Sequence, residues 1–142
     1  RPVPDGCGSC RACLSACPTG ALDPRHGLDA RRCLSFLTIE NRGPLPPGTG
    51  AAMGRCLYGC DRCQQACPHN RHAVPTTVPD FRPSDDFLAM TPKAWARLTL
   101  DDYRRLFRGS AVKRAKFDGL RRNIDAVLAV REGGDASATL SE

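Results

Sequence analysis

Two short runs of cysteine constrain what this chain can fold into more than any other feature. The first run has four cysteines at x2, x2 and x3 spacing and ends in Pro18; the second has three at x2 and x3 spacing and ends in Pro68. Three cysteines at such spacing wrap one [4Fe–4S] cluster, and the cysteine before the proline is directed to another cluster. The spacing therefore predicts two [4Fe–4S] clusters.

Two other uses of cysteine explain the pattern less well. Disulfides need an oxidising compartment, and no secretory leader opens the chain, which begins at Arg1 and is expected to be a piece of a longer protein. Zinc ribbons need neither a third cysteine at x2 spacing nor a Cys-Pro ending. Leu, Ile, Val and Phe make up only 27 of the 142 residues, so the clusters are expected to brace a thin apolar core. No run of 18 apolar residues is present to span a membrane.

The identity of the eighth ligand is open from spacing alone. Two clusters require eight thiolates, the chain has nine cysteines, and the second run lacks its first member. Cys33 and Cys56 are the candidates for that place. Asp29 is predicted to cap a helix in which Cys33, Phe36 and Leu37 share one face. Cys56 is interpreted as a small buried thiol.

The predicted fold is mainly α with irregular loops. It comprises a bacterial-ferredoxin-like double [4Fe–4S] domain followed by a small helical C-terminal region. Four parts are expected: the cluster domain at 1–72, a Pro-rich crossing segment at 73–90, a basic helical region at 91–132 and a flexible tail at 133–142. Short helical turns are expected after Cys10 and Cys60.

Capping signals predict helices in the basic region. Thr91 and Pro92 form an N-cap and first-turn pair, and Thr99 precedes Asp102 with capping-box spacing. A longer helix is expected at Val112–Val130. The apolar residues expected on its inner face are Phe117, Leu120, Ile124, Val127 and Leu128.

Most of the net charge of +6 falls in this helical region. Residues 91–132 carry eleven basic and five acidic side chains, whereas residues 1–90 carry ten and eight. Such an excess attracts polyanions, although a solvated helix face explains the pattern by itself. The residues predicted to contact phosphate are Arg104, Arg105, Arg108, Lys113, Arg114 and Lys116. Three arginines beside cysteines are candidates for raising the cluster potentials, namely Arg11, Arg32 and Arg62.

Four stretches carry a family pattern. They read Gly6-Cys-Gly-Ser-Cys-Arg-Ala-Cys13 with Ala16-Cys-Pro-Thr-Gly-Ala21, Leu28-Asp-Ala-Arg-Arg-Cys-Leu-Ser-Phe-Leu-Thr-Ile-Glu40, Tyr58-Gly-Cys-Asp-Arg-Cys-Gln-Gln-Ala-Cys-Pro68, and Phe107-Arg-Gly-Ser-Ala-Val-Lys-Arg114 with Leu120-Arg-Arg-Asn123. Together they cover most of residues 6–124 and resemble the iron–sulfur domain of epoxyqueuosine reductases.

The resemblance implies a cytoplasmic oxidoreductase of tRNA modification with two [4Fe–4S] clusters and a cobalamin. Such an enzyme reduces epoxyqueuosine to queuosine at the wobble position of tRNA. The family pattern makes Cys33 the eighth ligand. Cluster 1 would use Cys7, Cys10, Cys13 and Cys67, and cluster 2 would use Cys17, Cys33, Cys60 and Cys63. No catalytic residue is expected on this chain, because the half that binds most of the cobalamin would precede Arg1.

The resemblance also implies contacts and partners. Cobalamin is expected to meet Ser35, Glu40 and Asp61, and tRNA is expected to meet Arg42 in addition to the six basic residues above. The expected electron donor is a reduced flavodoxin or ferredoxin-type protein, and the enzyme is expected to be a monomer. The chain departs from the family pattern at two positions, Cys56 and His69.

Two other functions fit the cysteine runs. One is a stand-alone ferredoxin-like electron carrier, and the other is the iron–sulfur half of another corrinoid enzyme, such as a reductive dehalogenase. A carrier has no need for residues 91–132, and a dehalogenase has no need for a basic tail. The reductase is therefore the favoured hypothesis.

Overall fold

The structure is a computed structural model that describes residues 6–25 and 27–138, with side chains as far as residue 131. In chain order the helices are α1 (Ala12–Ala16), the 3-10 helix η1 (Ala30–Arg32), α2 (Leu34–Ile39), α3 (Thr49–Met53), α4 (Arg62–Gln65), η2 (Pro68–Asn70), η3 (Pro79–Phe81), α5 (Asp85–Leu88), α6 (Pro92–Ala96), α7 (Leu100–Leu106), η4 (Ala111–Ala115) and α8 (Lys116–Ala138). The β pairing within these residues is an isolated bridge between Leu22 and Leu28. The mainly α prediction is confirmed.

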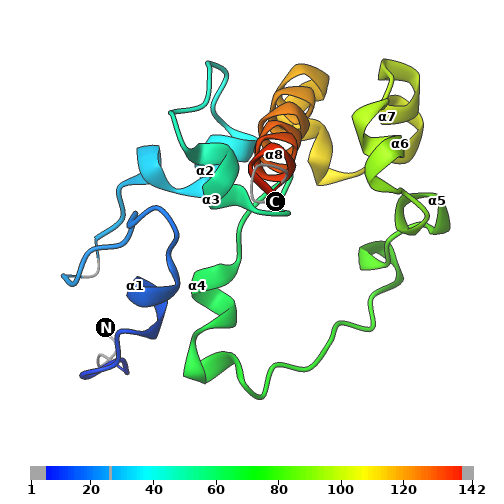
Figure 1. Ribbon diagram of the computed structural model, residues 1–142. Coiled ribbons are helices and arrows are strands. Elements are labelled where there is room, and N and C mark those ends of the chain that lie inside the picture. The colour runs from blue at the N-terminus through cyan, green and yellow to red at the C-terminus, as the bar shows by residue number, and fades with distance from the viewer. Residues whose placement is uncertain (1–5, 26, 139–142) are drawn as a thin grey trace.

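The long helix α8 organises the apolar core (Figure 1). Helices α2 and α3 contact it on one side, and α6 contacts it on another. The first side buries Leu34, Leu37, Met53 and Val127, and the second buries Leu98, Tyr103, Phe107, Leu120 and Ile124. The stripe predicted for this helix is confirmed, because its members are buried or packed against these clusters.

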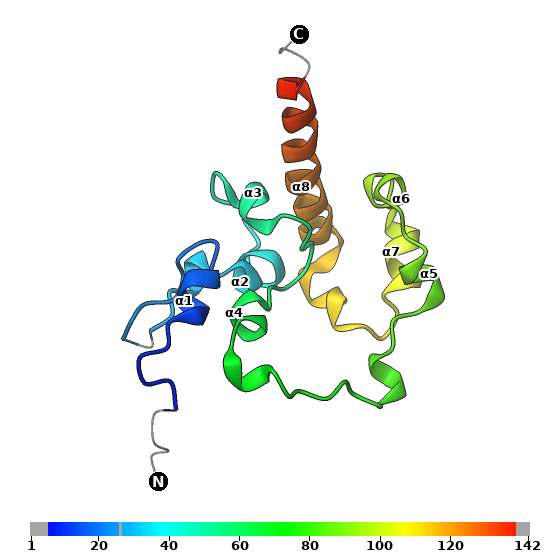
Figure 2. The same cartoon turned by 60° about the horizontal axis from the view of Figure 1, so that its bottom comes forward.

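The part of the chain that carries the cysteine runs has little apolar core. Helices α1 and α4 pack against each other, far from the free end of α8 (Figure 2). Neither helix contains a buried residue. Apolar burial alone therefore does little to hold this lobe together.

The predicted caps are present. Thr99 Oγ1 accepts a hydrogen bond of 3.1 Å from the Asp102 backbone N–H, and the Asp102 carboxylate accepts one from the Thr99 backbone in return. Thr91 caps α6 with Pro92 in its first turn. Asp29 accepts the backbone N–H of Arg31 at 3.1 Å, which starts η1. Each cap satisfies backbone donors that the first helical turn leaves unpaired.

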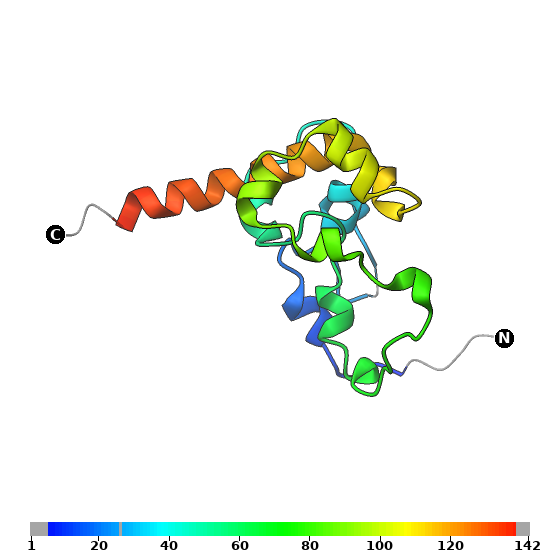
Figure 3. The same ribbon diagram turned by 90° about the vertical axis from the view of Figure 1, so that its right-hand side faces the viewer.

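The last helix differs from the prediction at both ends. It begins at Lys116 rather than Val112, because Lys116 has φ 61° and ψ 168°, a conformation that interrupts the helix after η4. It continues through Gly133 to Ala138, where the composition predicts a flexible tail, and this end extends away from the rest of the chain (Figure 3). A helix already held over several packed turns adds further residues at little cost. Residues 139–142 lie outside the described part.

The Pro-rich segment is exposed throughout residues 73–89. It is extended as far as Val78 and then forms η3 and α5, the latter capped by Ser84. The division of the chain into four parts remains a prediction. Among the described residues, no helix is both long and apolar enough to cross a bilayer.

Candidate iron–sulfur site

The two cysteine runs adopt matching conformations. Helix α1 begins just after Cys10 and α4 just after Cys60, so both predicted turns are confirmed. Their N-cap residues have similar backbone angles, with φ −132° and ψ 17° at Arg11 and φ −114° and ψ 15° at Asp61. Because α1 and α4 pack together, the two runs lie side by side (Figure 1).

Each run also ends in the same way. Cys17 has φ −77° and ψ 111°, and Cys67 has φ −71° and ψ 123°, so both stand outside the helix before them. Pro18 and Pro68 favour this extended conformation in the preceding residue and cannot continue the helix. Each of these two cysteines is predicted to bind the cluster that the other run surrounds, Cys17 in cluster 2 and Cys67 in cluster 1. A change of chain direction at the cysteine suits such crossed ligation.

The Cys17 sulfur accepts hydrogen bonds of the kind that stabilise a thiolate. The Ala21 backbone N–H donates to it at 3.3 Å, and Thr19 Oγ1 lies 3.7 Å away. Burial raises the pKa of this thiol, but the hydrogen bonds together outweigh burial and leave its pKa below the ordinary value. This arrangement favours the charged form that binds iron.

The structure corrects the predicted surroundings of Cys33. This residue lies between η1 and α2 as the N-cap of α2, with φ −69° and ψ 125°, rather than inside a helix. Phe36 is 37% exposed and forms no buried face with it. The buried side chains of α2 are Leu34, Leu37 and Thr38, because contact with α8 and η4 decides which face is inside.

Cys33 and Cys60 both act on the thiol of Cys63, the third cysteine of the predicted cluster 2 between residues 33 and 63. The pKa of the Cys63 thiol is raised, first by burial and in smaller part by the negative charge of Cys60 and Cys33. These three thiols therefore occupy one neighbourhood. Cys56 is half-buried and lines a cavity of about 390 Å³ together with Trp95 and Phe107.

The donor set consists of thiols, which as thiolates are the usual ligands of iron–sulfur clusters. The eight cysteines after Cys7 carry free thiols. In the part of the chain that the structure describes, no three His, Cys, Asp or Glu side chains converge closely enough to hold one ion. A four-iron cluster is larger than a zinc ion and separates its ligands further, and thiolates are the usual ligands of such clusters.

The three residues predicted to meet cobalamin differ in whether their side chains are already bonded to other parts of the chain. Ser35 Oγ accepts the Cys60 N–H at 3.0 Å and donates to the Cys60 carbonyl at 3.2 Å. Glu40 forms an ion pair with Arg114. Asp61 is exposed, and its side chain does not cap α4. Asp61 is therefore the most available of the three.

The residues beside the clusters mainly brace the backbone. Arg62 donates to the Ala52 and Met53 carbonyls at 2.8 and 3.1 Å, and Arg11 donates to the Cys10 carbonyl at 2.8 Å. His69 Nε2 lies 3.2 Å from the carbonyl oxygen of Gly6. This contact links the start of the first cysteine run to the end of the second. Arg32 is exposed. Their effect on the cluster potentials remains a prediction.

The residues predicted to meet tRNA fall into three groups. Arg42 donates to the backbone carbonyls of Ile39, Arg114 and Ala115, which holds α2 to η4. Three others form ion pairs: Arg104 with Asp101, Arg105 with Asp86 and Asp102, and Arg114 with Glu40. The remaining predicted residues, Arg108, Lys113 and Lys116, are exposed and form no ion pair with the described residues; they lie in the connection from α7 to α8.

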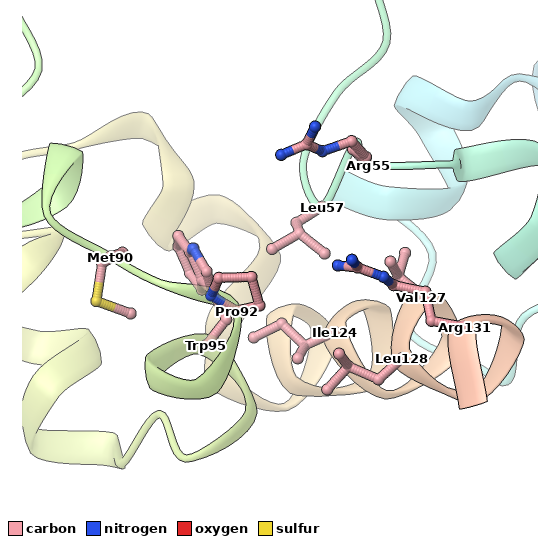
Figure 4. Close-up of a pocket in the computed structure, with 9 residues that line it drawn as sticks. All are labelled: Arg55, Leu57, Met90, Pro92, Trp95, Ile124, Val127, Leu128 and Arg131. Atoms are coloured by element: carbon pink, nitrogen blue, oxygen red, sulfur yellow. The ribbon is translucent and has the colours of Figure 1, made fainter. Parts of the chain in front are cut away.

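A pocket of about 160 Å³ has no cysteine among its lining residues (Figure 4). Met90, Pro92 and Trp95 line it from the α6 side, and Arg55, Leu57 and residues of α8 line the rest. It contains no thiol, so the cysteine runs rather than this pocket define the candidate site.

Sequence reasoning assigned no role to three polar residues near the site, Thr38, Arg122 and Asn123. Thr38 and Asn123 are fully buried, and Arg122 donates to the carbonyls of Leu37, Asn41 and Gly43. The available signal was a polar residue at position 123, inside the apolar stripe of α8.

Comparison with known proteins agrees with this geometry. The family described as the 4Fe-4S double cluster binding domain matches residues 6–70. The fold and the site thus define a protein with a double [4Fe–4S] domain and a helical extension. Over most of its length, the chain is similar to epoxyqueuosine reductases.

Three relatives illustrate this similarity. An epoxyqueuosine reductase of Cellulophaga algicola is 43% identical over 125 residues, covering 88% of this chain and 41% of the relative. The structure of the Bacillus subtilis epoxyqueuosine reductase covers 90% of this chain and 34% of its own, with 33% identity and a TM-score of 0.72. A crystal structure of an epoxyqueuosine reductase with an epoxyqueuosine-modified tRNA-Tyr stem loop has 33% identity and a TM-score of 0.71 over 90% of this chain and 34% of that one. The chain spans between 33% and 44% of the length of the curated relatives it matches.

Proposed function

We propose that this chain is the iron–sulfur part of a cobalamin-dependent reductase that converts epoxyqueuosine to queuosine at the wobble position of tRNA. The observation that carries the proposal is the side-by-side packing of two matching cysteine runs in a chain whose relatives are epoxyqueuosine reductases. A relative crystallised with a modified tRNA stem loop supports tRNA as the substrate.

The chain's own residues contribute thiolates and fixed loops. The proposed ligands of cluster 1 are Cys7, Cys10, Cys13 and Cys67, and those of cluster 2 are Cys17, Cys33, Cys60 and Cys63. When bound, the clusters supply one-electron transfer and cobalamin supplies the reaction with the epoxide. Reducing an epoxide to an alkene consumes two electrons and two protons and releases water. We therefore expect a reduced flavodoxin or ferredoxin-type protein as the electron source.

Most of the cobalamin is proposed to bind to a part of the enzyme outside this chain. Of the proposed contacts, Asp61 is the best supported, because Ser35 and Glu40 are already engaged in hydrogen bonding or ion pairing. Since the proposed substrate is tRNA, the enzyme is expected to act in the cytoplasm. It is also expected to be a monomer.

Activity of the full-length enzyme tests the proposal. Enzyme supplied with cobalamin, a reductant and tRNA containing epoxyqueuosine is expected to form queuosine, measured by liquid chromatography and mass spectrometry of the nucleosides. Cys63→Ala is expected to reduce product to background, because it removes a proposed cluster ligand. Cys56→Ala is the control and should retain activity. Normal turnover by the Cys63 variant would contradict the proposal.

The exposed cations around the α7–α8 turn are proposed to contact the tRNA backbone. Arg108, Lys113 and Lys116 are available there, whereas the charges of Arg104 and Arg105 are partly balanced by neighbouring aspartates. Contacts with phosphates raise affinity without reading sequence.

The salt dependence of tRNA binding tests these contacts. Replacing both Arg108 and Lys113 with Ala is expected to flatten the log–log slope of affinity against salt by about one to two, since each phosphate contact contributes roughly 0.7–0.9. Arg104→Ala is the matched control and should change the slope less, because Asp101 already pairs with Arg104 at 3.1 Å. An unchanged slope in the double variant would show that these residues do not contact phosphates and only form a solvated helix face. Filter binding from low to moderate salt provides the measurement.

A further inference from the structure

A buried asparagine joins the two segments that carry cysteines of cluster 2. Asn123 lies on α8 between the core residues Leu120 and Ile124 and is fully buried. Its Nδ2 donates to the carbonyls of Thr38 at 2.8 Å and Leu57 at 2.9 Å. Thr38 belongs to α2, which Cys33 caps, and Leu57 opens the loop that leads to Cys60. One side chain therefore links the backbone segments of two predicted ligands.

The loop between Leu57 and Cys60 is tied to α2 by further hydrogen bonds. The Gly59 N–H donates to Thr38 Oγ1 at 2.9 Å, and the Cys60 N–H donates to Ser35 Oγ at 3.0 Å. Thr38 Oγ1 in turn donates to the Leu34 carbonyl at 2.7 Å. Gly59 has φ 73°, a conformation that glycine adopts readily and that lets its N–H reach Thr38. Polar contacts of α2 thus fix the approach of the chain to Cys60.

The orientation of Asn123 is itself fixed. Its Oδ1 accepts hydrogen bonds from Arg122 Nε at 3.2 Å and from the Arg122 NH2 group at 2.9 Å. The same guanidinium donates to the Leu37 carbonyl at 2.9 Å. With Oδ1 occupied by Arg122, the amide must point its N–H groups at the two carbonyls.

We propose that Asn123 and Thr38 are positioning residues for cluster 2, acting through the backbone of Cys60 and the helix that begins at Cys33. A polar group at position 123 interrupts an apolar stripe, where Leu would bury more surface without a requirement for partners. The hydrogen bonds of Asn123 instead reach Thr38 and Leu57, in the segments that carry Cys33 and Cys60. This inference rests on the cluster ligands of the proposed function and is independent of the tRNA reaction.

Iron release from the reconstituted full chain tests the inference. Wild-type protein should first be shown to hold about eight irons, because two cubanes are required; a wild-type chain without them would refute the proposed function itself. Asn123→Asp keeps the size of the side chain but removes its N–H donors. Thr38→Val keeps the shape but removes the hydroxyl. Thr38→Ser restores the hydroxyl and serves as the conservative rescue.

The expected result is release in two phases. In Asn123→Asp and Thr38→Val, about four irons should pass to a chelator roughly ten-fold faster than in wild type, since loss of residues that orient metal ligands costs this much in affinity. The other four should leave at the wild-type rate. The electron paramagnetic resonance signal of one reduced cluster should change in the same variants, and Thr38→Ser should restore both readouts.

Arg121→Ala is the matched control on the same helix. Arg121 donates to the Ala96 carbonyl at 2.9 Å, so its loss loosens α6 rather than α2. It is expected to lower thermal stability without separating the two phases of iron release. Equal acceleration of both phases in the Asn123 and Thr38 variants, or wild-type release in both, would overturn the proposal. If Asn123→Asp does not fold, the comparison of Thr38→Val with Thr38→Ser decides it.

Discussion

Removing iron from the chain is expected to unfold the lobe that carries the cysteine runs while the helices around α8 stay folded. The reason is the uneven distribution of apolar burial. Helices α1 and α4 bury no residue, whereas both apolar clusters include residues of α8. Cluster ligation supplies the cross-links that the lobe lacks, so its folding free energy depends on the metal.

Metal analysis and hydrogen exchange together check this expectation. The reconstituted chain should contain about eight irons and eight sulfides. After chelation, backbone amides of residues 7–20 and 60–70 should exchange rapidly, while those of residues 120–128 stay protected. The untreated protein is the control. One equivalent of zinc without sulfide, or unchanged protection of the lobe after iron loss, would contradict the expectation.

Replacing Cys33 with Ala is expected to remove or degrade one cluster, with a three-iron form as the most stable product. Cys33 lies near Cys60, because Ser35, two residues after Cys33, forms two hydrogen bonds with the backbone of Cys60. A cluster with three thiolates loses the iron that has no protein ligand. Iron analysis and electron paramagnetic resonance distinguish the three-iron from the four-iron form.

The Cys56→Ala variant is the matched control for Cys33→Ala. Cys56 lines a cavity with aromatic residues, and truncating a small half-buried side chain costs about 1 kcal/mol of stability. We expect this variant to retain all its iron. Loss of a cluster from Cys56→Ala together with an intact Cys33→Ala protein would reverse the assignment of the eighth ligand.

Features governed by neighbours in the chain could be predicted from the sequence. The caps at Thr91 and Thr99 act within three residues, and both are present. The helical turns after Cys10 and Cys60 and the extended Cys17 and Cys67 follow from residues close in sequence. Spacing and prolines therefore suffice to predict the two matching loops.

The bounds of α8 show where local reasoning ends. The apolar stripe predicts its buried face, but the break at Lys116 comes from a backbone conformation that no residue type announces. Arg42 donates to the carbonyls of Arg114 and Ala115 just before this break, a contact between residues distant in sequence.

The sequence by itself determined the two cysteine runs, their prolines and the similarity to epoxyqueuosine reductases, because these depend on residue identity and spacing. Only the tertiary structure decided which polar side chains remain available. Ser35, Glu40 and Arg42 all find partners far away in the chain, at Cys60, Arg114 and Ala115. Asn123 meets Thr38 and Leu57 in the same way. Such pairings form only when α8 brings separate segments together, so no local pattern encodes them.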